Sequence, residues 1–334
     1  MAGLTDRITI NGMELMNRLV MPPLTTWKSS ASDGEVTDEL ISHYDEKTRG
    51  GYLGLVIMEH AYISQEGKAS KGQLSIASDD RIPGLRKLVD TIHGNGVKVV
   101  CQINHAGGKT GSDITGVPSA GPYRPLAEGL PEPDRMLTKE EILRAEDQFA
   151  AAAVRAKEAG FDGVEVHSAH GYLLCQFFSP LVNHRSDEYG GSLEQRIRIH
   201  LETIRKVREA VGPDYPVFIR LGCVDDMPGG SVIGDAAAAC RKFQEAGADL
   251  IDISGGMSGF IRKGMENVQG YYGEVSEEVK KNVDIPVLVT GGITEAKAAD
   301  ELIRQGRSDL TGVGRAILKD SEWPRKAMTQ LKGE

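Results

Sequence analysis

The sequence lacks the signals that would place a protein in a membrane or outside the cell. Its 334 residues include four cysteines, two tryptophans and only 5% aromatic side chains. No apolar run is long enough to cross a bilayer, and residues 1–10 lack the apolar stretch of a secretory signal. No low-complexity tract or block of like charge suggests disorder. The sequence therefore predicts a folded cytoplasmic protein.

The cysteines and the charge exclude two further classes of partner. No C-x-x-C pair is formed by the four cysteines, Cys101, Cys175, Cys223 and Cys240. A zinc or iron–sulfur site is therefore not expected, and we expect the cysteines to be small buried apolar side chains. A net charge of −9 disfavours nucleic acid and anionic membranes. A small molecule is the expected partner, and a homo-oligomer stays open.

Eight short apolar runs alternate with longer amphipathic segments. Runs of this kind are typical of buried parallel strands, and their alternation with helices predicts a parallel sheet. An open dinucleotide-binding sheet would carry G-x-G-x-x-G after its first strand, whereas Met21-Pro-Pro-Leu-Thr-Thr26 contains no glycine. We therefore predict an α/β fold, a (β/α)8 TIM barrel in which residues 1–334 form one domain. The expected strands are Arg18–Met21, Leu53–Met58, Val97–Ile103, Gly163–His167, Val217–Leu221, Leu250–Ile253, Val287–Val289 and Leu310–Val313.

Capping signals predict where several helices begin and end. Thr138 with Glu141, and Ser192 with Gln195, have the spacing of capping boxes. The predicted helices are Glu140–Ala159, Arg196–Ala210, Asp38–Lys47 after an N-cap at Thr37, and Glu295–Gln305 after an N-cap at Thr294. Glycines that favour helix ends follow three of the helical segments, namely Gly160, Gly247 and Gly306.

Two segments do not fit the strand–helix repeat. Thr9–Leu15, with Asn11-Gly12 as its turn, predicts a short hairpin that closes the barrel bottom. Gly107–Asp134 predicts a long loop after the third strand, rich in glycine and proline. Loops of that length inside a compact domain are usually functional.

Polar residues follow the apolar strands, on the face where barrels place their working residues. Gly291, Gly292 and Gly314 form turns that open helices, where backbone N–H groups beside Arg315 suit a phosphate. Gln102 offers an amide for an edge of donors and acceptors, and Arg220 offers a fixed cation. A flavin ring has such an edge and becomes negative near N1 when reduced.

His167 and His170 lie three residues apart at the expected end of the fourth strand. They are open to three interpretations: a satisfied polar pair, metal ligands, or two donors that polarise a carbonyl oxygen with Tyr172 as a nearby acid. Glu165 shares the strand face of His167, but nothing completes a ligand set. We expect the oxyanion interpretation and no metal site.

One run of the chain begins with His167-Ser-Ala-His170-Gly-Tyr172, continues through Ser179-Pro-Leu-Val-Asn183-His-Arg185-Ser-Asp187 and ends with Tyr189-Gly-Gly-Ser192. This run resembles the signature of the old yellow enzyme family of FMN-dependent ene-reductases. Asn17–Thr25 resembles its first strand, Gln102–Gly107 its third, and Thr290–Ile293 with Gly312–Arg315 its phosphate loops. The resemblance extends from about Ile8 to Trp323.

The resemblance implies a role for each matching residue. Pro23, Thr25 and His60 would lie beside the FMN ring, Gln102 and Arg220 would bind its pyrimidine edge, and the substrate pocket would include Trp27. The ribityl phosphate would bind to Gly291, Gly292, Gly314 and Arg315. His167 and His170 would bind the activating group of the substrate, while Tyr172 protonates one carbon of an activated C=C bond and FMN, reduced by NADH or NADPH, supplies hydride to the other.

Two features differ from many relatives, and two other functions remain open. Thr25 stands where some relatives have cysteine, and His60 where many have a small residue. Arg185 and Asp187 are expected to pair and brace their loop. The alternatives are a phosphate-binding aldolase or isomerase, although no predicted strand end carries lysine, and a non-catalytic or electron-transfer flavoprotein.

Overall fold

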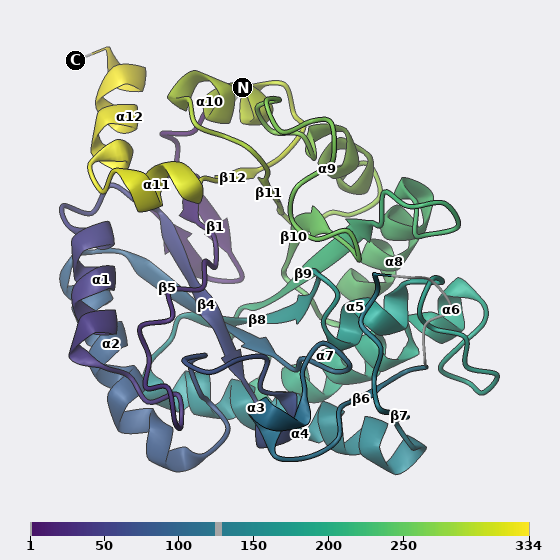
Figure 1. Cartoon of the computed structure of the whole chain (residues 1–334). Helices are drawn as coiled ribbons and strands as arrows, with labels where there is room; N and C mark the ends of the chain where they lie inside the picture. Colours follow the sequence, from purple (N-terminus) through teal and green to yellow (C-terminus); the bar gives the residue numbers. More distant parts are fainter. Residues whose placement is uncertain (1, 124–128, 334) are drawn as a thin grey trace.

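Eight parallel strands close into a barrel in the computed structural model, which describes residues 2–123 and 129–333. Helices surround the barrel on its outside (Figure 1). The closed order is β10-β11-β12-β3-β4-β5-β8-β9, which confirms the predicted fold class. The strands are β3 (Leu19–Met21), β4 (Leu55–Tyr62), β5 (Lys98–Asn104), β8 (Gly163–Ser168), β9 (Val217–Val224), β10 (Leu250–Gly255), β11 (Val287–Thr290) and β12 (Leu310–Gly312).

The helices begin largely where the capping residues predict. Thr37 caps α1, and complete capping boxes at Thr138 and Ser192 begin α4 and α6. The exception is Thr294: its hydroxyl accepts from Gln269, so the N-cap moves to Glu295. The helices are α1 (Asp38–Thr48), α2 (Ile82–Gly94), α3 (Ser112–Thr115), α4 (Lys139–Ala159), α5 (Leu173–Phe178), α6 (Leu193–Arg196), α7 (Arg198–Val211), α8 (Ile233–Ala246), α9 (Gly273–Lys280), α10 (Ala296–Arg304), α11 (Arg315–Lys319) and α12 (Trp323–Lys332), with short 3-10 turns at Gln65–Gly67 and Asp79–Arg81.

The predicted hairpin closes one end of the barrel. Strands β1 (Ile8–Ile10) and β2 (Met13–Leu15) pair antiparallel across Asn11 and Gly12, which both have positive φ. Their apolar side chains join one buried cluster with the innermost side chains of the barrel, which include Val20, Leu55, Ile57, Val100, Phe218, Leu250, Leu288 and Leu310. The bottom of the barrel is therefore a packed apolar core.

A polar layer lies above this apolar layer. Side chains two positions apart on a strand share a face, so Gln102 follows Val100, Arg220 follows Phe218, and Asp252 follows Leu250 toward the other end of the barrel. Each of these three polar side chains is at least 96% buried. The interior thus changes from apolar to charged toward the C-terminal ends of the strands.

The segment after β5 carries some structure of its own. It contains α3 and the short strand β6 (Ala120–Gly121), which pairs with β7 (Arg135–Met136). Residues 124–128 of the predicted Gly107–Asp134 loop lie outside the described residues. In the described part of the chain, no helix is long and apolar enough to span a membrane.

Candidate active site

The turn after β8 brings three ring side chains together. His170 has a φ of 58° and is followed by Gly171 at 74°. A positive φ is costly for a residue with a side chain and often marks a functional turn. Ring centroids lie 5.1 Å apart for His167 and His170, and 5.2 Å apart for His167 and Tyr172. The structure thus brings together the three residues predicted to carry the chemistry.

The two histidines are neutral donors in a buried setting. Burial lowers the pKa of both His167 and His170 well below the usual histidine value, and neighbouring positive charge adds to the effect. Nε2 of His170 lies 2.7 Å from Oγ of Ser254, whereas Nδ1 of His167 is buried and has no partner in the described part of the chain. Nδ1 of His167 is therefore available to a hydrogen-bond partner other than the described residues.

Tyr172 has the properties of a protonated acid. Burial raises the pKa of its phenol to about 12, so the hydroxyl keeps its proton at neutral pH. Nζ of Lys109 lies 4.9 Å from the Tyr172 ring centroid and donates to the carbonyl of His170 at 2.7 Å. The sequence did not identify Lys109 as a site residue, because only the folded loop after β5 places its cation over the turn.

His60 lies against the same group of rings. Its ring centroid is 6.0 Å from that of His167 and 5.3 Å from that of Tyr172. Its Nε2 lies 3.1 Å from Oγ1 of Thr25. Two residues predicted to flank the flavin, one from the loop after β3 and one from β4, therefore lie in contact.

Arg220 belongs to the polar layer inside the barrel. The sequence predicts Arg220 close to the end of the fifth strand, Val217–Leu221, and this prediction is wrong, because β9 continues to Val224. Its Nε lies 3.1 Å from Asp252 Oδ2, and Gln102 donates to Glu165 Oε1 at 2.8 Å. Burial and the neighbouring Asp252 raise the pKa of Glu165 well above its usual range, and burial raises the pKa of Asp252 to about 6. Period-two alternation within β10 was the signal that could have identified Asp252.

The glycines after β11 and β12 leave little room for a side chain. A Cβ at Gly291 or Gly292 would lie within 2.9 Å of the Tyr271 ring, and Gly292 has a φ of 66°. A Cβ at Gly314 would meet Leu24 at 3.2 Å. The exposed Arg315 follows directly, and among the described residues no ion pair occupies it. Gly291 is buried, whereas the partly exposed backbone at Gly292 and Gly314 and the exposed Arg315 suit a phosphate.

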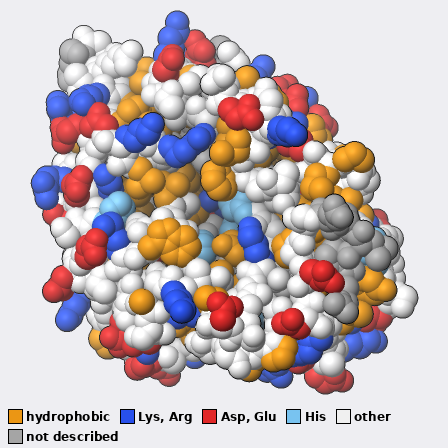
Figure 2. All heavy atoms as spheres, in the orientation of Figure 1, with side chains coloured by type: hydrophobic (Ala, Val, Ile, Leu, Met, Phe, Trp, Pro, Cys, Tyr) orange, Lys and Arg blue, Asp and Glu red, His pale blue; other side chains and the backbone are white. Residues whose placement is uncertain are grey.

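The opening of the barrel is apolar and cationic at its edge. Figure 2 shows histidine side chains in a hollow of this face, with hydrophobic, Lys and Arg side chains around it. Trp27 is 60% exposed and has a φ of 60°, and Phe260 lies 6.0 Å from the His170 ring. Pro23 and Thr25 are half-buried in the loop that leads to Trp27.

Unpartnered buried atoms test whether a flavin fits this hollow. Both amide atoms of Asn104 and the hydroxyl of Thr290 are buried without a hydrogen-bond partner in the described part of the chain. Asn104 follows Gln102 on the same face of β5. With Gln102 and Arg220, these atoms supply donors and acceptors of the kind that suit the polar edge of an isoalloxazine ring. Among the described residues, no group of His, Cys, Asp and Glu could hold a metal ion.

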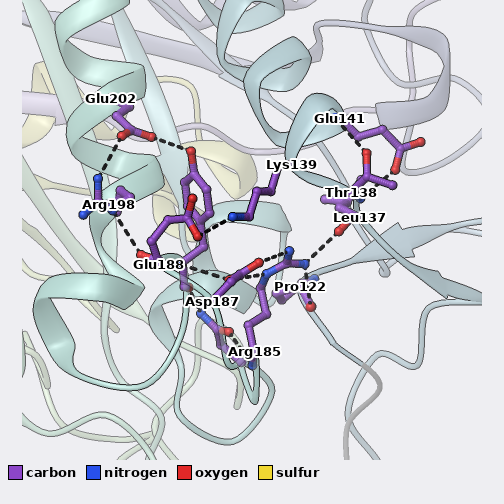
Figure 3. Close-up of polar contacts among 12 residues, drawn as sticks. Pro122, Leu137, Thr138, Lys139, Glu141, Arg185, Asp187, Glu188, Arg198 and Glu202 are labelled. Atoms are coloured by element: carbon purple, nitrogen blue, oxygen red, sulfur yellow. Dashed lines mark hydrogen bonds and ion pairs between the residues drawn. The ribbon is translucent and has the colours of Figure 1, made fainter.

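The loop after the ring cluster is held by an ion pair, as predicted. Arg185 Nη2 lies 2.6 Å from Asp187 Oδ2 and its Nε donates to Oδ1 (Figure 3). The same guanidinium donates to the carbonyls of Pro122 and Leu137. Arg185 therefore links the loop that contains Arg185 and Asp187, here called the signature loop, to the segment after β5.

The chain is similar to flavin oxidoreductases over nearly its whole length. The model of the NADH:flavin oxidoreductase / NADH oxidase family matches residues 4–334. An NADH oxidase of Thermoanaerobacter brockii is 39% identical, over 97% of this chain and 50% of the relative. An NADPH dehydrogenase of Bacillus subtilis is 36% identical, over 98% and 94% respectively. The chain spans about half the length of the first two curated relatives that it matches.

Solved structures give the same result. A 2-naphthoyl-CoA reductase complex superposes with a TM-score of 0.91 at 27% identity, covering 99% of this chain and 52% of that chain. An old yellow enzyme homologue from Zymomonas mobilis superposes with a TM-score of 0.84 at 25% identity, covering 98% and 93%. The predicted relationship to the old yellow enzymes is confirmed, and the chain belongs to the NADH:flavin oxidoreductase / NADH oxidase family.

Proposed function

We propose that this chain is an FMN-dependent ene-reductase that takes electrons from NADH or NADPH and reduces a C=C bond activated by a carbonyl or similar group. The observation that carries the proposal is the cluster of His167, His170 and Tyr172, whose rings lie 5.1–5.2 Å apart at the barrel opening. A flavoprotein that only stores flavin or passes electrons needs no such combination of two neutral donors and one acid.

The two histidines bind the activating oxygen of the substrate. Each neutral imidazole carries one N–H, and two N–H groups directed at a carbonyl oxygen stabilise the negative charge that grows there when hydride is added. Because burial lowers the pKa of both rings well below the usual histidine value, both are neutral at neutral pH.

Tyr172 supplies the proton. Its buried phenol stays protonated at neutral pH, and the Lys109 cation above its ring offsets charge that remains after proton transfer. General acids of this kind contribute about 10²–10⁴-fold to a rate. Reduced FMN supplies the hydride for the other carbon.

The remaining residues hold the cofactor. Gln102, Arg220 and Thr25 suit the flavin ring, while Arg315 and the backbone after β11 and β12 suit the phosphate. The family match, which names a flavin, and the relatives named for NADH and NADPH support this assignment. We propose that residues 1–334 act as one FMN-binding barrel.

The replacement Tyr172→Phe tests the proposal, with the two half-reactions measured separately by stopped-flow absorbance. Flavin reduction by NADH or NADPH should stay within about threefold of the wild type, whereas flavin reoxidation by cyclohexenone should slow by about 10²-fold or more. Tyr215→Phe removes a phenol that donates to Phe161 O away from the rings and is the matched control. Equal slowing of both half-reactions by Tyr172→Phe would contradict the role of proton donor.

A further inference from the structure

A buried glutamine outside the ring cluster fixes the orientation of His60. Gln73 is 1% exposed and lies in the segment that runs beside β4. Its Oε1 accepts from the backbone N–H of Ala69 at 2.6 Å, and a backbone N–H can only donate. The amide nitrogen of Gln73 must then be the atom that faces His60, 2.7 Å from Nδ1.

The amide defines the tautomer of His60. An amide nitrogen donates and does not accept, so Nδ1 of His60 accepts and the ring proton resides on Nε2. Burial lowers the pKa of His60 to about 4, which keeps the ring neutral with that single proton. Nε2–H lies 3.1 Å from Thr25 Oγ1 and 3.5 Å from the Tyr172 hydroxyl oxygen.

A donor at this position determines where two hydroxyl hydrogens can go. Neither the Thr25 nor the Tyr172 hydroxyl can donate to a nitrogen that already carries a proton. The phenol hydrogen of Tyr172 is therefore directed away from His60, toward the hollow shared with His167. After Tyr172 gives up its proton, the same N–H stabilises the phenolate oxygen.

We propose that the chain Ala69 N–H, Gln73 and His60 is a directional hydrogen-bond relay that makes His60 a positioning residue for Tyr172. It rests on the proposed function, in which Tyr172 is the proton donor. His60 orients the phenol and supports its anion without itself exchanging a proton with the substrate, since the amide of Gln73 cannot replace a proton lost from the ring.

The tautomer can be measured without any turnover. Two-bond ¹H–¹⁵N correlation spectra of the protein labelled at histidine nitrogens distinguish an Nε2–H ring from an Nδ1–H ring. The proposal expects His60 to show the Nε2–H pattern from pH 6 to pH 8, assigned by its absence in His60→Gln. An Nδ1–H pattern or an imidazolium in that range would overturn it.

The kinetic test replaces the N–H donor that Gln73 presents to His60 with a hydrogen-bond acceptor. In Gln73→Glu a carboxylate accepts from Ala69 N–H and from His60, so the neutral ring moves its proton to Nδ1 and its Nε2 becomes an acceptor. Flavin reoxidation by cyclohexenone should then slow about 10- to 100-fold at pH 8. It should recover as the pH falls, because an imidazolium again carries Nε2–H.

Several groups face His60 and shape that pH dependence. Lys109 and Arg220 oppose charging of the ring, and the rings of His167 and Tyr172 lie beside it. The carboxylate in Gln73→Glu favours charging. Wild-type protein should show no such recovery at low pH. A profile for Gln73→Glu parallel to that of the wild type would overturn the proposal.

Matched variants distinguish positioning from structure. His60→Phe removes the donor and should slow reoxidation about 10- to 100-fold, whereas His60→Gln restores an N–H near the Nε2 position and should recover most of the rate. His60→Phe/Gln73→Leu avoids an unpaired buried amide, so a folding failure of the single variant leaves the test intact. Equal rates for the Phe and Gln variants would contradict the relay. If Tyr172→Phe alone has no effect on reoxidation, the proposed function fails instead.

Discussion

At the scale of single residues, the sequence revealed the chemical groups but not their partners. His167, His170 and Tyr172 could be identified because one turn joins them in the chain. Gln73 could not, because it reaches His60 only through the pairing of its segment with β4. Asn104 and Lys109 likewise acquire their surroundings from elements far apart in sequence.

The role of His167 can be tested by ligand binding. His167→Ala removes a buried ring whose Nδ1 has no partner among the described residues, so it should weaken binding of a para-substituted phenol about 10- to 100-fold, the value of a hydrogen bond to a charged ligand. Titration of the flavin absorbance measures the dissociation constant. His184→Ala, on an exposed loop histidine, is the control, and an unchanged constant for His167→Ala would remove this residue from the oxyanion site.

At the scale of elements, helix starts and strand positions followed from local signals, whereas strand lengths did not. Thr138 and Ser192 form their capping boxes as predicted, since a capping box depends on four consecutive residues. Strand β9 extends past Arg220 because it stays paired with neighbouring β10, with Gly222 opposite Ser254 and Val224 opposite Gly255. Such pairing is a property of the closed sheet and has no local signal.

The turn after β11 should bind the flavin phosphate through glycine backbone. Gly292→Ala forces a Cβ to within 2.8 Å of Tyr271 and of Val268 O at a φ of 66°, so FMN affinity should fall more than tenfold. Gly12→Ala is the matched control, because Gly12 also has a positive φ but no atom within 4 Å of its Cβ. Both should cost about 1 kcal/mol of backbone strain. Equal FMN affinity in fluorescence titrations would contradict the phosphate role.

The brace between the signature loop and the segment after β5 should depend on pH. The Arg185 guanidinium lowers the pKa of Asp187, so its stabilisation is complete above the usual aspartate pKa and is lost as the pH falls through the lowered value. Asp187→Asn should therefore reduce the free energy of unfolding by about 1–2 kcal/mol at pH 7 and by progressively less below pH 4. Urea titrations at several pH values measure it, and a constant difference down to pH 2.5 would exclude this ion pair as the cause.

At the scale of the whole molecule, one end of the barrel is a packed apolar core and the other end carries the residues proposed for the chemistry. The hairpin and the apolar layer close one end, and the polar layer of Gln102, Glu165, Arg220 and Asp252 leads to the rings of His167, His170 and Tyr172 at the other. The fold class could be predicted because strand–helix alternation and the absent glycine fingerprint permit few topologies. The composition of the polar layer could not be predicted, because it requires four strands to be placed side by side.

The central claim is that this barrel binds FMN and uses it to reduce an activated double bond. The most direct measurement is the visible spectrum of the purified protein, reconstituted with FMN and kept under argon, before and after NADH, NADPH and then cyclohexenone. We predict flavin bands that bleach with a nicotinamide and return with the enone. A protein that shows no bound flavin after reconstitution, or whose reduced flavin persists when the enone is added, would contradict the account.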